Sequence, residues 1–325
     1  MADSKKYRIY VLLVIPAILI AYLILDDFLS DGVNDRSGNP YAYPIESLIR
    51  TNPDLLKYRE VHRIKLNIPD PVGIDYYKGK VGILYEHAYQ LIDTMGQELF
   101  NRLTETKNSG ISFSPHGELF IASGNKVIKL GPDGKPLQSW KVQGNEPFIT
   151  ALAFSNDVIY VADAGQRLVR RFDLQGVEQG SFDGTGRLEG NHGFVLPSHY
   201  FDMAIDQEGE LWVANTGLLA IENYTEDGRL RAFWGKPSFD EQGFSGCCNP
   251  AHFIILQDGS VVTSEKGLIR IKVHAPSGEF ECLVAGPEDF DKDAAPPDLA
   301  ADELGRIFVL DISRSVIRIF ERKIA

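Results

Sequence analysis

Two aspartates and a histidine, Asp202, His252 and Asp298, occupy the same position in three consecutive repeats of this sequence. Carboxylate oxygens and an imidazole nitrogen are common ligands of divalent metals, and such sites often keep positions open for water or substrate. We therefore predict a candidate metal site, with Glu265 and Asp311 as candidate catalytic bases. Polar residues at such positions also hydrogen-bond to neighbouring backbone or ordered water, and the sequence leaves that alternative open.

The repeats that must position these residues consist of apolar runs separated by Gly turns. Equivalent positions in the six copies recur at intervals of 37 to 52 residues and are Gly73, Gly110, Thr150, Asp202, His252 and Asp298. This period is typical of propeller blades. The fourth copy predicts strands at 201–206, 210–214, 220–224 and 230–234, joined in part by tight turns. The sequence thus predicts an all-β, six-bladed propeller over residues 58–325, with four-stranded antiparallel blades.

Ring closure follows from one missing strand and one surplus strand. The last copy ends after predicted strands at 298–302, 306–310 and 316–322, so its blade lacks an outer strand. The strand-like segment 60–68 precedes the first copy and has no blade of its own. We predict that this N-terminal strand completes blade six.

Three long connections between blades are predicted to lie on the same face of the ring. They span residues 183–200, 235–251 and 285–297, and all belong to blades four to six. Long loops on a rigid scaffold are common places for binding. We predict a partner or ligand rim on this face that includes His87, His199, Phe239, Phe244 and Asn249.

Cys247 and Cys248 are adjacent in the second of these loops, four residues before His252. They form a candidate redox or disulfide site, because neighbouring cysteines can close a strained ring that is comparatively easy to reduce. Free buried thiols, metal binding and pairing with Cys282 are the alternatives. No C-x-x-C-H motif occurs, so covalent haem is not predicted.

Residues 9–25 form an aliphatic run that is interrupted only by two tyrosines and a proline. Its length is at the short end of what spans a bilayer, and Lys5, Lys6 and Arg8 precede it. We predict a cytoplasmic N-terminus at 1–8, a transmembrane anchor at 9–25 and a linker at 26–57 with one short helix. A cleaved secretory signal is the alternative.

The formal net charge of −12 and the pI of about 5.1 give an acidic protein. Such a surface repels phosphate, so a nucleic-acid partner is not expected. No phosphate loop, nucleophile elbow or H-E-x-x-H motif occurs, and a nucleotide cofactor is not predicted. One divalent metal ion remains the candidate cofactor.

The sequence resembles the NHL-repeat class of six-bladed propellers over about residues 58–323. Within that class it is similar to a family of membrane-anchored bacterial proteins, on the segments NPDLLKY (52–58), VADAGQR (161–167), WGK (234–236), GFSGCCNP (243–250), SEKG (264–267) and VAGP (284–287). The Gly-Cys-Cys-Asn-Pro run is the most specific of these. The resemblance implies fold and topology more than activity.

Besides redox sensing or electron transfer through Cys247 and Cys248, two functions from other classes are compatible with these features. The first is a non-enzymatic propeller, tethered to the bacterial cytoplasmic membrane and facing the periplasm or cell exterior. It would bind another membrane or periplasmic protein as a docking or assembly subunit, for example of a redox or envelope complex. The second is a metal-dependent hydrolase or lyase with its site at the channel mouth of blades four to six.

Overall fold

The computed structural model describes residues 14–16, 18–22, 49–186 and 193–324. The chain divides into one unit at Met1–Ile45 and a second at Glu46–Ala325. In the first unit, residues 14–16 and 18–22 are helical. The rest of the predicted anchor at 9–25, the predicted segment 1–8 and most of the predicted linker lie outside the described residues. Among the residues that are described, no helix is both long and apolar enough to cross a membrane.

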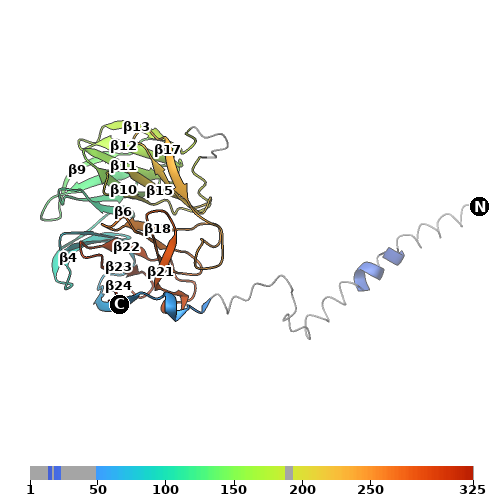
Figure 1. The fold of residues 1–325 in the computed structure, drawn as a ribbon. Helices are drawn as coiled ribbons and strands as arrows, with labels where there is room; N and C mark the ends of the chain where they lie inside the picture. Colours follow the sequence, from blue (N-terminus) through green and yellow to red (C-terminus); the bar gives the residue numbers. More distant parts are fainter. Residues whose placement is uncertain (1–13, 17, 23–48, 187–192, 325) are drawn as a thin grey trace, which may run out of the picture. The chain divides into compact units, whose positions relative to one another are not determined.

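Six four-stranded antiparallel sheets build the second unit, and each is one blade. Blades one and two consist of β2 (Pro71–Tyr77), β3 (Lys80–Tyr85), β4 (Ala88–Asp93), β5 (Glu98–Leu103), β6 (Asn108–Phe113), β7 (Leu119–Ser123), β8 (Lys126–Leu130) and β9 (Pro136–Lys141). Blades three and four consist of β10 (Ile149–Ser155), β11 (Val158–Asp163), β12 (Leu168–Asp173), β13 (Glu178–Phe182), β14 (Met203–Ile205), β15 (Leu211–Asn215), β16 (Ala220–Tyr224) and β17 (Leu230–Trp234). Blade five consists of β18 (His252–Ile255), β19 (Val261–Ser264), β20 (Ile271–His274) and β21 (Phe280–Ala285), and blade six of β22 (Asp298–Ala301), β23 (Ile307–Asp311), β24 (Val316–Arg322) and β1 (Tyr58–Lys65). The six-bladed propeller predicted from the repeats is confirmed (Figure 1).

The N-terminal strand completes blade six and closes the ring, as predicted from the strand count. β1 pairs antiparallel with β24, from Tyr58 opposite Arg322 to Lys65 opposite Val316. Before β1, Pro53–Leu55 forms one turn of 3-10 helix, η1, capped by the Asn52 side chain. A short helix is predicted around residues 45–58, and residues 45–48 lie outside the described residues. In the described part Ile49 is helical, η1 follows at Pro53–Leu55, and the chain is extended from Tyr58. A second 3-10 turn, η2 (Pro287–Asp289), lies between blades five and six.

The hairpin turns inside blade four form where glycine permits them. Gly209 and Gly228 both have φ near +80°, a backbone conformation that L side chains rarely adopt. They end the turns β14–β15 and β16–β17, and the four strands match the predicted ranges to within about two residues at each end. Local turn chemistry therefore sets the blade register.

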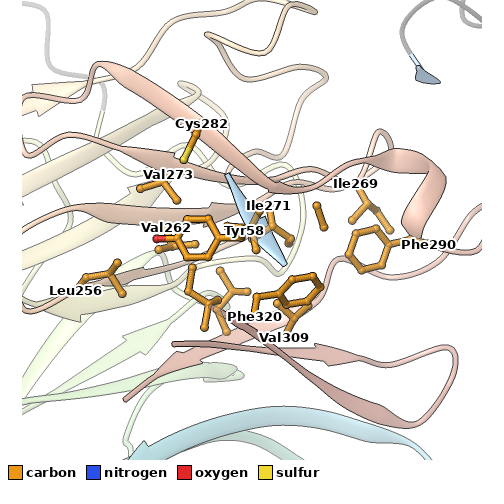
Figure 2. Close-up of a cluster of buried hydrophobic side chains, with 14 residues drawn as sticks. Tyr58, Leu256, Val262, Ile269, Ile271, Val273, Cys282, Phe290, Val309 and Phe320 are labelled. Carbon is orange, nitrogen blue, oxygen red and sulfur yellow. The ribbon is translucent and has the colours of Figure 1, made fainter. Parts of the chain in front are cut away.

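Hydrophobic side chains fill the space between neighbouring blades, in six buried clusters that follow the ring. Figure 2 shows the cluster between blades five and six, where Tyr58 from β1 and Phe320 from β24 meet Val262 and Val273 of blade five. Cys282 belongs to this cluster and is 1% exposed. The inner strands are thereby held around a central channel.

Candidate functional site

The central channel is lined by the innermost strand of every blade and encloses a cavity of about 360 Å³. All six residues that the repeats make equivalent line it, namely Gly73, Gly110, Thr150, Asp202, His252 and Asp298. At these six positions, blades one to three contribute small or neutral groups, and blades four to six contribute two carboxylates and an imidazole. Elsewhere along the channel, Asp75 of blade one adds a further carboxylate to the lining. The alignment of the repeats predicted this gathering of side chains.

Asp202, His252 and Asp298 converge at the start of their strands. His252 Nδ1 lies 3.7 Å from Asp202 Oδ2 and 3.5 Å from Asp298 Oδ1, and one ligand atom from each residue falls within 4.8 Å of the others. The side chains are 17%, 20% and 19% exposed, respectively. This trio, called the mouth trio below, is therefore partly buried but open to solvent.

Backbone N–H groups fix the orientation of both carboxylates. Asp202 Oδ2 accepts from Phe253 N of blade five at 2.9 Å, and Asp298 Oδ2 accepts from Ile74 N of blade one at 2.9 Å. Each aspartate also accepts from the N–H of the residue that follows it, at 2.8 Å. The hydrogen-bonding role that the sequence left open is thus real, and it binds neighbouring blades together. These hydrogen bonds also hold the carboxylates in place beside His252. Each carboxylate keeps further lone pairs that can bind a ligand.

Electrostatics at the trio favours positive charge. Burial alone would lower the pKa of His252, but the charges of Asp298 and Asp202 outweigh it and raise the pKa above its ordinary value. Burial raises the pKa of Asp298 to about 6, with Asp202 adding to the rise and His252 opposing it. The site therefore holds an excess of negative charge that a proton or a cation neutralises.

One aromatic residue from the rim contacts the trio. The Tyr200 ring meets the His252 ring edge-on, with centroids 5.6 Å apart, and Lys266 Nζ lies 5.6 Å from the centre of the Tyr200 ring. Burial raises the pKa of Tyr200, and the nearby Cys248 adds to the rise. The loop with the two cysteines is therefore adjacent to the mouth.

Glu265 and Asp311, the candidate bases, lie elsewhere. Glu265 pairs with Lys272 (2.6 Å), and both side chains are 0% exposed. Asp311 is buried and pairs with Arg314 (3.1 Å) and Arg318 (3.9 Å). Neither lines the cavity, because each carboxylate turns back toward the third strand of its own blade. The structure does not bring them together with the mouth trio, and we assign them no catalytic role.

A repeated pair that the sequence reasoning missed explains these two residues. In blades three to six, a polar residue at the end of the second strand contacts a polar residue seven positions later on the third strand. The pairs are Asp163–Arg170, Asn215–Glu222, Glu265–Lys272 and Asp311–Arg318. We call these contacts the staples. The sequence signal that could have found them is the constant spacing of seven residues.

The staples also hold the loops that precede each blade's inner strand. Asp163 Oδ1 accepts from Phe148 N at 3.0 Å, Asn215 Oδ1 from Val195 N at 2.9 Å, and Glu265 Oε2 from Ser245 N at 3.1 Å. A buried polar group needs such partners, since leaving it unpaired is costly. The staples therefore position the long connections of the mouth face.

The cysteines are free thiols in the structure. Cys247 is exposed, Cys248 is buried, and their Sγ atoms lie 3.3 Å apart. Their mutual hydrogen bond raises the pKa of the Cys247 thiol. Cys282 is buried in the core between blades five and six (Figure 2). The adjacent disulfide stays a prediction about the oxidised protein.

The predicted rim residues divide into exposed and buried members. His87 and His199 are exposed, and the His199 ring packs on Phe148. Phe239 is 40% exposed, whereas Phe244 is buried against Trp234. Asn249 is buried too, and its side chain holds its own loop together. None of these five lines the channel cavity.

Comparison with known proteins gives a fold but no family. No family model matches the chain, and no curated protein matches it in sequence. A structure of streptogramin B lyase is similar with a TM-score of 0.55 and 13% identity, over 82% of this chain and 98% of that one. A catalytically inactive virginiamycin B lyase from Staphylococcus aureus, with a histidine replaced by alanine and with quinupristin, gives a TM-score of 0.54 and 13% identity over 82% and 100%. A protein of unknown function from Bacteroides caccae gives 0.54 and 14% identity over 71% and 85%.

Proposed function

We propose that the propeller is a divalent-cation-dependent enzyme of the lyase or hydrolase class, with its site at the mouth trio. The observation that carries the proposal is the meeting of Asp202, His252 and Asp298, from three consecutive blades, with ligand atoms within 4.8 Å of one another. When bound, a divalent cation would act as a Lewis acid on a substrate oxygen.

The donor set fits such a cation. Adjacent ligands of a metal that sits about 2.1 Å from each are separated by roughly 3–3.5 Å, and the distances from His252 Nδ1 to the two carboxylates are 3.5 and 3.7 Å. One imidazole and two carboxylates favour manganese, iron or zinc over magnesium or calcium, because the latter prefer oxygen alone. Three protein ligands leave positions for water or substrate.

The chain's own residues supply orientation and charge. The hydrogen bonds from Phe253 N and Ile74 N hold the carboxylates in place before anything binds, which avoids reorganisation at that moment. His252 must be neutral to act as a ligand, so a cation has to displace its proton. The raised pKa of His252 therefore makes proton and cation compete for the trio.

The mouth positions of blades one to three leave space for a substrate beside the trio. Gly73, Gly110 and Thr150 line the channel from blades one to three and have small side chains or none. A small molecule, or an extended group of a larger one, fits a cavity of about 360 Å³. The ligand class that matches is a neutral or anionic molecule whose oxygen reaches the cation.

The structural neighbours add an analogy of fold. One similar propeller is a streptogramin B lyase, and another is a virginiamycin B lyase that is inactive when one histidine becomes alanine. At 13% identity these support the capacity of the fold to host such chemistry and do not carry a substrate to this chain.

Manganese binding to the full-length protein tests the proposal. We expect about one Mn²⁺ per chain by electron paramagnetic resonance, with affinity reduced about 100-fold or more in His252→Ala. The matched control is His116→Ala, which removes an exposed histidine that does not line the cavity and should leave the affinity unchanged. Stoichiometric binding that survives His252→Ala would show that the ion sits elsewhere, and absence of binding would end the proposal.

The membrane-tethered docking role stays a separate prediction. It rests on residues 9–25, on the long rim loops and on the resemblance to membrane-anchored NHL-repeat proteins. Copurification of the full-length protein after mild detergent extraction tests it, and a protein that always runs alone counts against it.

A further inference from the structure

The loop from Ser245 to Asn249 is fixed at both ends. Asn249 Nδ2 donates to Ser245 O at 2.6 Å and so closes the loop on itself, and Asn249 Oδ1 accepts from Lys266 N at 2.6 Å. Ser245 N donates to the buried Glu265 carboxylate at 3.1 Å. These three hydrogen bonds therefore hold the intervening residues in one arrangement.

Cys247 and Cys248 are the side chains that this loop presents. Their sulfur atoms already touch at 3.3 Å, and the two thiols differ in access, since Cys247 is exposed and Cys248 is 4% exposed. Cys282 is the third cysteine of the chain and is buried between blades five and six. The adjacent pair is therefore the thiol pair placed to react together.

The surroundings of the pair connect it to the channel mouth. Lys266, whose backbone N–H binds Asn249, extends its side chain over the Tyr200 ring. Tyr200 is close enough to Cys248 for the thiol to affect its pKa, and the Tyr200 ring contacts His252. Tyr200 and Lys266 thus connect the loop that carries the pair to the mouth trio.

We propose that Cys247 and Cys248 form a reversible dithiol–disulfide site on the rim of the channel mouth, oxidised by small-molecule disulfides. The exposed Cys247 attacks first because it is the accessible thiol. Its thiolate bonds to one sulfur of the disulfide, and the other sulfur leaves as a thiol after taking up the proton that Cys247 lost. A mixed disulfide on Cys247 results.

Cys248 completes the exchange. Its thiolate attacks the Cys247 sulfur, the bond to the small molecule breaks, and the second small thiol leaves with the proton from Cys248. Overall, one dithiol and one small disulfide become one protein disulfide and two small thiols, so that two electrons pass from the protein. The product closes an eight-membered ring through the peptide bond between the two cysteines.

Equilibration of the full-length protein with mixtures of reduced and oxidised glutathione tests this. After acid quenching, denaturation and alkylation with N-ethylmaleimide, we expect intact mass to show three adducts at the reducing end and one at the oxidising end. Peptide mapping should assign the remaining adduct to Cys282, and excess reduced glutathione should restore all three.

Two variants make the order of events visible. Cys248→Ser lacks the resolving thiol, so it should accumulate glutathione on Cys247, while the wild type should not. Cys247→Ser should take up little glutathione, because Cys248 is buried. Circular dichroism confirms that each variant is folded.

Three results would overturn the proposal. They are three free thiols at every glutathione ratio, wild-type protein that accumulates mixed disulfide like Cys248→Ser, and oxidation that yields dimers of the chain through Cys247. None of these measurements needs a bound cation, so their outcome is independent of the function proposed for the mouth trio.

Discussion

The molecule carries two sets of polar side chains, the mouth trio of blades four to six and the staples of blades three to six. Both sets contain carboxylates from blades four to six, and the residues of each set recur at a fixed position of the sequence repeat. At the mouth, Asp202, His252 and Asp298 keep 17–20% of their side-chain surface exposed. In the staples, Glu265 and Lys272 are 0% exposed and bonded to each other.

The mouth trio and the staples differ in the partners of their polar groups rather than in their residue types. Each staple carboxylate or amide meets a polar group on the next strand, and the pair also holds a loop. The mouth carboxylates accept only backbone N–H bonds on one side and face His252 on the other. Two carboxylates at the mouth therefore share one titratable partner, His252, and this excess of negative charge can act on a ligand. In the staples the polar groups hold the preceding loops, and each needs its partner because an unpaired buried charge is costly.

The largest effect is expected when a buried staple is broken. Lys272→Met leaves Glu265 buried without its cation, and we expect a loss of about 3–5 kcal/mol in the free energy of unfolding. Chemical denaturation measures this. Cation affinity at the mouth should change little in Lys272→Met, whereas His252→Ala should lose cation affinity and lose less stability than Lys272→Met.

Two controls sharpen that result. Lys129→Met removes a cation from the partly exposed pair with Glu118 and should cost at most about 1 kcal/mol. The double variant Glu265→Leu with Lys272→Met should recover part of the loss, because no unpaired charge remains. Equal losses in Lys272→Met and Lys129→Met would show that the buried pair is no more important than a surface one.

The mouth trio should make the stability of the fold depend on pH. Asp298 has its pKa raised from 3.8 to about 6 in the folded chain, and the pKa of His252 is raised as well, so the fold binds protons more tightly than the unfolded chain. The Asp298 contribution is complete below about pH 4 and is lost as pH rises through 6. It amounts to at most about 3 kcal/mol, since one pKa unit corresponds to about 1.4 kcal/mol.

Thermal melts of EDTA-treated protein test this from pH 7.5 down to 5.5. We expect the melting temperature to rise over this interval, and Asp298→Asn to reduce the rise. Saturating Mn²⁺ should stabilise the protein at pH 7.5 more than at pH 5.5, because it takes the place of the proton. An identical pH slope in the wild type and in Asp298→Asn would contradict the assignment.

Much of the fold could be predicted from the sequence because its causes are local. Glycine turns such as Gly209 and Gly228 recur with the repeats, and alternation of apolar residues marks the strands. The closing strand followed from counting, since Tyr58–Lys65 had no other place to pair. The alignment of repeats also predicted that Asp202, His252 and Asp298 meet, because equivalent residues of a closed ring share one level of the channel.

The sequence could not show which polar residues face inward and which are paired. Glu265 and Asp311 follow second strands on the same face as the trio, and only the positions of Lys272 and Arg318 show that they turn away. The rim prediction met the same limit, since Phe244 and Asn249 are rim residues by position but are buried in contacts between loops. Such contacts depend on the path of a long loop, which no local signal determines.

The smallest effect is expected at Thr150, one of the three mouth positions that carry no charge. Thr150 Oγ1 donates to Phe201 O of the next blade at 2.7 Å, so blade three is bound to blade four as Asp202 binds blade four to blade five. Thr150→Val keeps the shape and removes the hydrogen bond, and we expect a loss of about 1 kcal/mol in denaturant unfolding. Cation affinity should stay within twofold of the wild type, since Thr150 is not one of the trio. A large drop in affinity would mean that the neutral positions of the mouth, at Gly73, Gly110 and Thr150, also take part in binding.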